Sequence, residues 1–329
     1  MYTIKDKPED FVVTERIALE LDESGEYAYF WLHKRQYTTI RALEKISGFL
    51  RCKTKDIGFA GNKDKHAMTK QAISIRDPGN HIGADRFERF DSEGMRLEYI
   101  GRGKKTINLG NLDGNDFEII VRDCDKAPSE VSQFINYYDE QRFSTNNRTV
   151  GEAILKKDFK KACETMGEDI VNSHLEELPN DYIGALKKLP LKIRIMYVHS
   201  YQSWLWNETV NQYLQCKYEC IKEQYSLGEL SFPIDKVPDM QVPIVGFELE
   251  LGDDELSKII KELMKREGMT ERNFVINTMP ELTAEGGHRN IAVAVDGLKI
   301  EKIKERVYRL KFSLQKGSYA TMAVRRMMA

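Results

Sequence analysis

The patterning of the 329-residue chain changes twice, near residues 149 and 289. Before residue 149 and after residue 289, apolar residues alternate or form short runs, as in β-strands. Between these two points, apolar residues recur at helical spacing. The stretch "DDELSKIIKELMKREGM" in the middle is typical of an amphipathic helix. A mainly helical segment between two strand-forming ends predicts an inserted domain, with the C-terminal segment completing the sheet of the first domain.

We therefore expect an α+β fold in two parts. Residues 1–149 and 289–329 would form a domain with a mixed or antiparallel sheet flanked by helices, and residues 150–288 an inserted, mainly helical α+β domain. The pattern predicts a helix over 38–51, with Thr38 or Thr39 as its N-cap, and another over 129–140.

Composition limits the kind of protein. Hydrophobic residues make up 41% of the chain and charged residues 31%, which is enough apolar material for sizeable cores. Apolar runs stay well short of the roughly 20 residues that cross a bilayer, and "MYTIKDKPED" lacks the apolar stretch of a signal peptide. We expect a cytoplasmic protein with no membrane partner.

The cysteines favour reduced thiols. Their number is odd, and they lack paired metal spacing; they are Cys52, Cys124, Cys163, Cys216 and Cys220. Cys216 and Cys220 lie four apart in an expected helix, where we interpret them as small residues on one face rather than half of a metal site. The six histidines are scattered, so no metal is predicted.

The formal net charge of −2 hides an uneven distribution. Residues 1–149 hold 24 Lys and Arg against 25 Asp and Glu, residues 150–288 hold 16 against 24, and residues 289–329 hold 10 against 3. If the first and last segments share a domain, that domain carries a net +6 beside an acidic one. This charge asymmetry is typical of a domain that binds a polyanion. Solvent-exposed faces of strands and a helix explain it equally well.

The loop "GFAGNKDKHAMTKQ", from Gly58 to Gln71, is the densest polar cluster behind a short apolar strand. Its glycines do not directly precede a helix, so a phosphate-binding loop is a weak interpretation. A solvated turn is the common alternative. Ala60, Ala67 and Met68 give the loop apolar anchors, however, and an aspartate flanked by lysines stays ionised, as a nucleophile or base requires. Asp64 is therefore the candidate catalytic residue.

Three further segments carry residues suited to RNA. "INYYDEQRFSTNNR" mixes aromatic, amide and arginine side chains, a combination that fits an unstacked nucleotide but also an amphipathic helix end. "KDKPEDF" brings Lys5 and Phe11 near the start of a strand. "KGSYATMAVRR" places Tyr319 at a helix start, where an ordinary cap is the plainer interpretation.

Taken together, these segments resemble the tRNA pseudouridine synthase D family over nearly the whole chain. The resemblance is carried by five stretches in the family's order, namely "KDKPEDFVVTE", "AGNKDKHAMTKQ", "NYYDEQRFS", "SYQSWLWNETV" and "KGSYATMAVRR". It implies a pseudouridine-synthase catalytic domain interrupted by a family-specific domain. It also implies isomerisation of a tRNA uridine, typically uridine 13 of the D arm, to pseudouridine.

The resemblance assigns roles to individual residues. Asp64 matches the catalytic aspartate, and Lys5 matches a basic residue of the pocket. Phe11, Asn136 and Tyr319 match positions that contact the substrate nucleotide. The target uridine must leave its stack, and Tyr138 is the candidate to hold the detached ring. Asn136 would fix either its own loop or the uracil edge.

The implied reaction needs no cofactor. The bond from C1′ to N1 breaks, the uracil turns, and C5 joins C1′, so neither a redox cofactor nor a metal is required. Asp64 would attack the sugar or the base, or remove a proton from the ribose, and the sequence leaves these alternatives open. We expect tRNA as the partner and a monomeric protein, with the inserted domain acting as a tRNA clamp.

Three positions depart from the family's usual "NYFG" and "QRFG". Asp139 and Ser144 stand where glycine is common, and Tyr138 stands where phenylalanine is common. Tyrosine preserves stacking, whereas Asp139 and Ser144 lose glycine's conformational freedom. The competing hypotheses are a non-catalytic RNA-binding or RNA-remodelling protein of the same fold and, less favoured, a nucleotide-binding enzyme.

Overall fold

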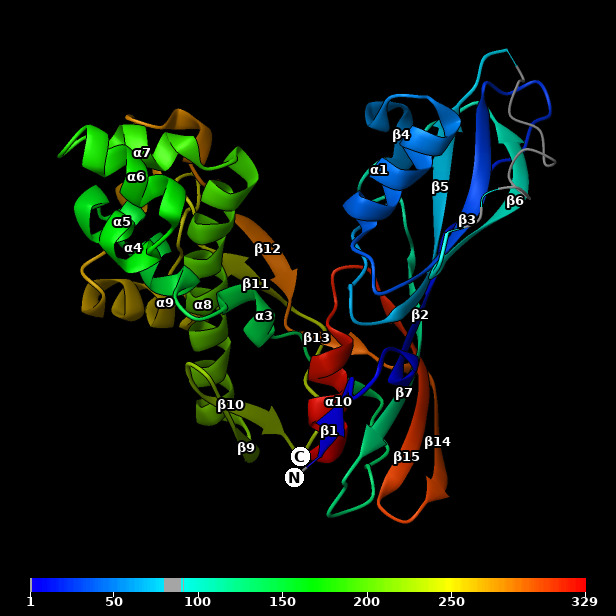
Figure 1. Cartoon of the computed structure of the whole chain (residues 1–329). Helices are drawn as coiled ribbons and strands as arrows, with labels where there is room; N and C mark the ends of the chain where they lie inside the picture. The colour runs from blue at the N-terminus through cyan, green and yellow to red at the C-terminus, as the bar shows by residue number, and fades with distance from the viewer. Residues whose placement is uncertain (1, 80–89, 91) are drawn as a thin grey trace. The chain divides into compact units, whose positions relative to one another are not determined.

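The computed structural model describes residues 2–79, 90 and 92–329, which divide into two compact units. Unit 1 comprises the described residues up to Ser132 together with Ala294–Ala320 and Met328. Unit 2 comprises Gln133–Val293, Thr321–Met327 and Ala329. Strands dominate unit 1 and helices dominate unit 2, so the expected α+β class is confirmed (Figure 1).

Unit 1 is built on a nine-stranded mixed sheet. Its strands are β1 (Thr3–Ile4), β2 (Phe11–Arg16), β3 (Tyr27–Arg35), β4 (Ile57–Phe59), β5 (Met68–Arg76), β6 (Met95–Gly103), β7 (Gly114–Arg122), β14 (Asp296–Lys304) and β15 (Val307–Gln315). The order is β14-β15-β7-β2-β5-β3-β6, with β1 on β7 and β4 on β5. Only β2 and β5 pair in parallel among these strands, which sets the start of β5 beside the start of β2.

Helix α1 (Thr39–Leu50) covers one face of this sheet. Thr38 is its N-cap, because the side-chain oxygen accepts a hydrogen bond from the N–H of Arg41. Apolar residues of the helix, including Leu43 and Ile46, pack with alternate residues of β3 such as Phe30 and Leu32 in one buried cluster. The helix expected over 38–51 is thus confirmed.

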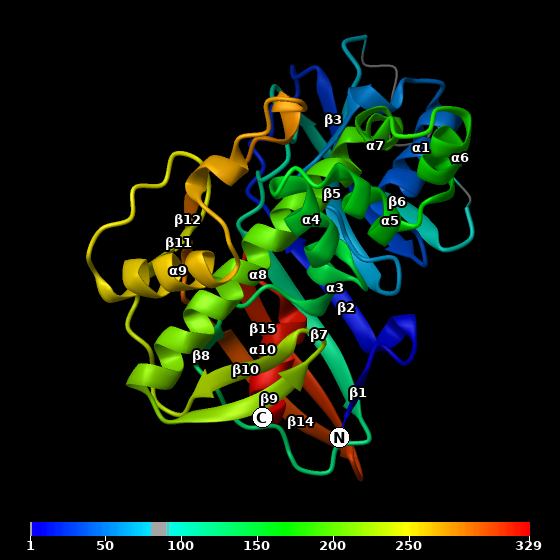
Figure 2. The same cartoon turned by 90° about the vertical axis from the view of Figure 1, so that its left-hand side faces the viewer.

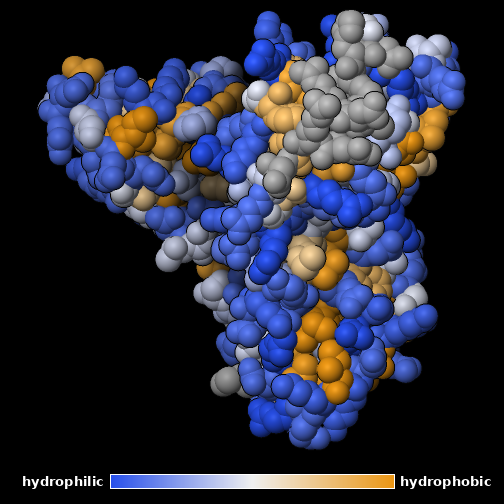
Figure 3. Space-filling model, turned by 45° about the vertical axis from the view of Figure 1, so that its right-hand side comes forward, coloured by the Kyte–Doolittle hydropathy of each residue, from blue (hydrophilic) through white to orange (hydrophobic). Residues whose placement is uncertain are grey.

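The opposite face of the sheet carries a second buried apolar cluster, which includes Tyr29 and Ala72, and also a group of charged side chains. Strand alternation turns His33, Lys70 and Glu98 to this face, where the Glu98 carboxylate lies 2.8 Å from His33 Nε2 and 3.5 Å from Lys70 Nζ. Figure 3 shows unit 1 from a side on which hydrophilic residues surround small apolar patches. The catalytic candidates lie on the other face, with Phe11 and the loop before β5.

Unit 2 is arranged around one long helix, α8 (Leu191–Lys217) (Figure 2). Tyr201 and Trp206 of this helix are fully buried. Its other helices are α3 (Glu140–Phe143), α4 (Asn147–Leu155), α5 (Phe159–Met166), α6 (Asp169–Glu177), α7 (Tyr182–Lys188) and α9 (Glu255–Arg266). Short strand pairs complete it: β9 (Cys220–Tyr225) with β10 (Gly228–Pro233), and β11 (Gln241–Ile244) with β12 (Gly287–Asn290). Strand β8 (Gln133–Ile135) pairs with β13 (Ala292–Ala294).

Two local predictions are wrong. The segment 129–140 is not a helix, because Gln133–Ile135 forms β8 and the N–H of Asn136 donates to Ile291 O at 2.8 Å. Pairing with a distant segment overrides the local helical pattern. Cys220 is not in the same helix as Cys216, because α8 ends at Lys217 and Cys220 begins β9.

Among the described residues, none of the helices combines the length and apolar character needed to cross a membrane. The helix expected near the C-terminus is present as α10 (Ala320–Met328), directly after Tyr319.

Candidate active site

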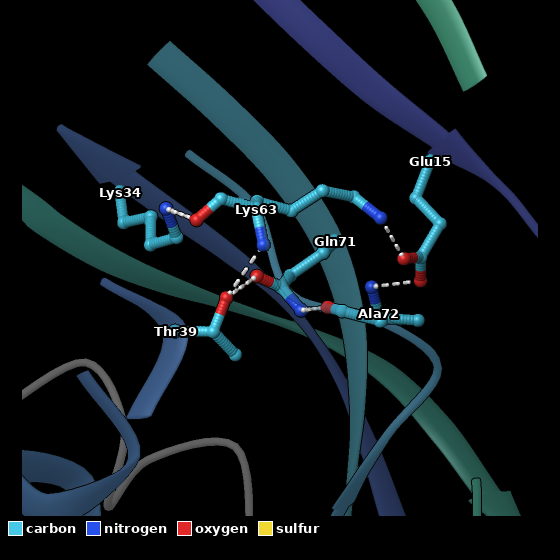
Figure 4. A network of polar contacts seen from close by, with 7 residues as sticks. Glu15, Lys34, Thr39, Lys63, Gln71 and Ala72 are labelled. Carbon is cyan, nitrogen blue, oxygen red and sulfur yellow. Dashed lines mark hydrogen bonds and ion pairs between the residues drawn. The ribbon is translucent and has the colours of Figure 1, made fainter. Parts of the chain in front are cut away.

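The loop that carries Asp64 joins β4 to β5 and is held by a network of hydrogen bonds (Figure 4). The backbone N–H of Lys63 donates to Thr39 Oγ1 at 2.9 Å. That hydroxyl donates to Gln71 Oε1 at 2.9 Å, and Gln71 Nε2 donates to Gly61 O at 3.1 Å. Because Thr39 opens α1 and Gln71 lies in β5, a helix and a strand both hold the loop.

Lys63 turns its side chain inward. Its Nζ lies 2.5 Å from Glu15 Oε2, and the Lys63 and Glu15 side chains are 6% and 0% exposed. The second Glu15 oxygen accepts from the backbone N–H of Ala72 at 3.1 Å. A buried ion pair thus connects the loop to β2 and β5. The neighbouring Asp64 projects its carboxylate outward, with 43% of the side chain exposed.

The cation beside Asp64 is Lys5. Its Nζ lies 2.6 Å from Asp64 Oδ2 and 4.2 Å from the centre of the Phe11 ring. The flanking Lys63, which the sequence suggested as a cation beside Asp64, forms its ion pair with Glu15 instead. Unit 1 therefore brings together three of the predicted residues, Lys5, Phe11 and Asp64.

The segment between Lys5 and Phe11 is itself fixed. Asp10, which is 1% exposed, accepts from Arg122 Nε and Nη2 at 2.8 and 2.7 Å. This paired contact holds the short 3-10 helix Pro8–Asp10 on β7. Lys5 has a φ of +59°, a conformation that costs a lysine free energy and directs its side chain in a defined way. The geometry around Asp64 is thus preorganised by residues on β2 and β7.

Asn136 and Tyr138 form a second group, within unit 2. Arg289 donates from Nε to Asn136 O at 2.9 Å and from Nη2 to Asn136 Oδ1 at 2.7 Å, and its guanidinium lies 4.2 Å from the Tyr138 ring centre. Asn136 Nδ2 donates to Asn290 O at 3.2 Å. The amide of Asn136, which is 4% exposed, is therefore engaged in holding its own loop.

The backbone of Tyr138 is held by α8. Asn207 Oδ1 accepts from the Tyr138 N–H and Asn207 Nδ2 donates to the Tyr138 carbonyl, both at 2.9 Å. The Trp206 ring meets the Tyr138 ring edge to face at 5.7 Å. The motif "SYQSWLWNETV" thus supplies the residues that orient this tyrosine.

Tyr319 lies in unit 1, is partly buried, and directly precedes α10 in the sequence. The predicted residues therefore fall into two sets, with Lys5, Phe11, Asp64 and Tyr319 in unit 1 and Asn136 and Tyr138 in unit 2. Their roles toward a substrate stay predictions.

Sequence reasoning missed the residues that hold the candidates in place. Lys34, Glu15 and Gln71 look like ordinary strand residues, and Arg289 looks like the start of a strand. Asn207 lies inside a quoted motif but carried no assigned role. What distinguishes Lys34, Glu15 and Gln71 is that they are polar and lie on a buried face of a strand. That face is known only from the structure.

The two departures from the family's glycines differ in conformation. Asp139 has φ −77°, which any residue adopts, so glycine is not needed there. Its carboxyl is buried, which raises its pKa, and it bonds to Thr321 in unit 2. Ser144 has φ +45° and ψ −141°, a region that favours glycine.

We expect Ser144→Gly to raise the free energy of unfolding by about 1 kcal/mol, because it relieves backbone strain that outweighs glycine's extra freedom in the unfolded chain. Asp139→Gly is the matched control and should lower it, since that position has an ordinary φ and loses its contact with Thr321. Urea unfolding measures both. A Ser144→Gly protein that is less stable than the wild type would contradict the account.

In the described part of the chain, no three His, Cys, Asp or Glu side chains are grouped so that they could hold a metal ion. The chemistry available at Asp64 is that of an exposed carboxylate beside an ammonium and an aromatic ring.

Comparison with known proteins identifies the family to which the whole chain belongs. The family model described as tRNA pseudouridine synthase D (TruD) matches residues 2–172, 167–225 and 236–327. The chain belongs to the tRNA pseudouridine synthase D family, whose members are isomerases.

Individual relatives agree over their full length. The chain is 28% identical to tRNA pseudouridine synthase D of Aquifex aeolicus, covering 98% of this chain and 97% of that protein. It is 29% identical to the probable tRNA pseudouridine synthase D of Thermococcus sibiricus, covering 99% and 94%. A crystal structure of the putative TruD from Methanosarcina mazei matches with a TM-score of 0.72 at 25% identity, covering 99% of this chain and 93% of that one.

Proposed function

We propose that this protein isomerises a uridine of tRNA to pseudouridine, with Asp64 as the catalytic carboxylate and uridine 13 of the D arm as the target. The observation that carries the proposal is the state of Asp64. It is an exposed carboxylate whose neighbour Lys63 is anchored by a buried ion pair and a backbone hydrogen bond, and it lies within the sequence that the family model matches.

The chemistry fits the surroundings of this carboxylate. The uridine must leave its stack, after which the bond from C1′ to N1 breaks and C1′ bonds to C5. The proton lost from C5 is balanced by one gained at N1, so the product is an isomer of the substrate. Lys5 supports the proposal because its ammonium forms an ion pair with the Asp64 carboxylate. The Phe11 ring lies beside the Lys5 ammonium.

In unit 2, Tyr138 is the proposed stacking partner of the detached uracil. Its support is the Asn207 bonds to its backbone and the Arg289 guanidinium near its ring. We assign Asn136 to fixing this loop, since its side chain bonds Arg289 and the Asn290 carbonyl. The inserted domain over 150–288 as a tRNA clamp, the cytoplasmic location and the monomeric state stay predictions.

The test is to incubate the protein with unmodified tRNA transcripts and to map pseudouridine by carbodiimide modification and primer extension. Product at uridine 13, and its loss when that uridine is replaced by cytidine, is the expected result. Product at another position would overturn the choice of uridine. Absence of product on every tRNA of the source organism would favour a non-catalytic RNA-binding protein.

A further inference from the structure

Lys34 is a buried lysine that the proposed chemistry does not use. It lies in β3, and only 3% of it is exposed. Lysine is almost never fully buried unless its ammonium has partners, because moving a charge out of water is costly. A lysine in such a place therefore needs a structural reason, and its contacts supply one.

The ammonium of Lys34 meets three backbone carbonyls. Nζ donates to Tyr37 O at 2.8 Å, to Lys63 O at 3.1 Å and to Asp64 O at 2.8 Å (Figure 4 shows the bond to Lys63). An ammonium has three N–H donors, so these contacts account for all of them. Two of the three acceptors belong to consecutive residues of the loop, one of which is Asp64 itself.

These bonds hold the carbonyls of Lys63 and Asp64, whereas the other contacts of these two residues given above hold an N–H and the side chains. Lys63 is also held through its N–H and its side chain, and Asp64 through its carboxylate at Lys5. Lys34 fixes the peptide that joins these residues, and with it the direction in which the Asp64 side chain leaves the backbone. Small displacements of a reacting group are costly, since a 1 Å misplacement reduces rates by as much as about a hundredfold.

We propose that Lys34 is a positioning residue for the reaction, in which its ammonium binds the carbonyls of Lys63 and Asp64 and sets the orientation of the Asp64 carboxylate. The proposal rests on the proposed catalytic role of Asp64. It predicts that charge and donor number at Lys34 affect turnover although Lys34 does not touch the substrate.

The surroundings of Lys34 also favour sensitivity to pH. Burial lowers the pKa of Lys34 to about 8, and Lys63 adds to this effect while Asp64 opposes it. Lys34 also contacts Tyr37, but through the backbone carbonyl, because the Tyr37 phenol accepts a hydrogen bond from Lys45. Above about pH 8 Lys34 loses a proton and turns a lone pair toward one of the carbonyls. The loop is therefore expected to loosen, and kcat to fall, as the pH rises through this range.

The variant Lys34→Met removes the charge and all three donors while keeping an unbranched side chain. We expect kcat for pseudouridine formation to fall by roughly tenfold to a hundredfold, with KM and the Kd for tRNA changed by less than about twofold. Hydrogen exchange at the amides of residues 62–66 should become faster. Lys70→Met is the matched control, because Lys70 lies on β5 but faces the other side of the sheet, where it contacts Glu98 and the Trp31 ring. It should leave both measurements near the wild-type values.

Lys34→Arg gives a second test, because arginine stays charged across the accessible pH range. It should recover part of kcat and lose the fall above about pH 8 that the wild type shows. If Lys34→Met fails to fold, the wild-type and Lys34→Arg pH profiles still decide the matter. Wild-type kcat and loop exchange in a folded Lys34→Met protein would overturn the inference, as would identical pH profiles for Lys34→Arg and the wild type.

Asp64→Asn, measured alongside, separates this inference from the proposed function. An active Asp64→Asn protein would mean that the catalytic role of Asp64 is wrong. An inactive Asp64→Asn protein together with a fully active Lys34→Met protein would mean that only the positioning role of Lys34 is wrong.

Discussion

Asp64→Ala is expected to abolish pseudouridine formation and to leave tRNA binding largely intact. We expect kcat to fall by about a hundredfold to ten-thousandfold or more. Asp64 is the group we propose to form or break a bond to the reacting nucleotide, so no other contact replaces it. Its side chain is 43% exposed, and truncating it leaves the buried loop contacts in place. The measurements are single-turnover pseudouridine formation, the Kd for tRNA and the thermal melting temperature.

Asp116→Asn is the matched control for this experiment. Asp116 is another partly exposed aspartate of unit 1, with 50% of its side chain exposed, and it has its own cation in Arg16 at 3.9 Å. The control should keep activity near the wild-type value. A folded Asp64→Ala protein that still forms pseudouridine would refute the catalytic assignment. An Asp64→Ala protein that does not fold would indicate that Asp64 is needed for structure.

The partner of Asp64 shows what local sequence could and could not predict. Two of the three apolar anchors expected for the loop, Ala60 and Ala67, are buried, whereas Met68 is 38% exposed and the prediction is wrong there. The flanking Lys63 and Lys65 were expected to keep Asp64 charged, because they are its neighbours in the sequence. The structure gives this position to Lys5, which is 59 residues away, because successive loop residues point to opposite sides. Adjacency in sequence therefore did not predict the ion pair of Asp64.

Contacts between residues far apart in the sequence also explain why the helix predicted over residues 129–140 is wrong. Their apolar spacing favours a helix, but Gln133–Ile135 pairs with β13, about 160 residues later in the chain. The position of Asn136 follows from that pairing and from Arg289, neither of which local spacing can reveal. By contrast, α1 was predictable from its N-cap and its apolar face, since both signals lie in the residues of the helix itself or directly before it.

Glu15→Ala should lower the stability of unit 1 by about 3–5 kcal/mol, because it leaves the ammonium of Lys63 buried without its partner. It also removes the acceptor for the backbone N–H of Ala72. The two side chains are 0% and 6% exposed, so water cannot easily replace the lost contact. Urea unfolding combined with hydrogen exchange at the amides of β5 would measure the loss within unit 1.

A double replacement distinguishes a buried charge from simple loss of packing. Changing Glu15 and Lys63 together to methionine removes both charges, so the loss of stability should be smaller than the sum of the two single replacements. Glu20→Ala is the exposed control, since the Glu20 side chain is 82% exposed and pairs with Lys105 at the surface. It should unfold close to the wild type. A Glu15→Ala protein as stable as the Glu20→Ala protein would show that the pair beneath Asp64 does not hold the loop, and the preorganised geometry proposed for catalysis would then need another source.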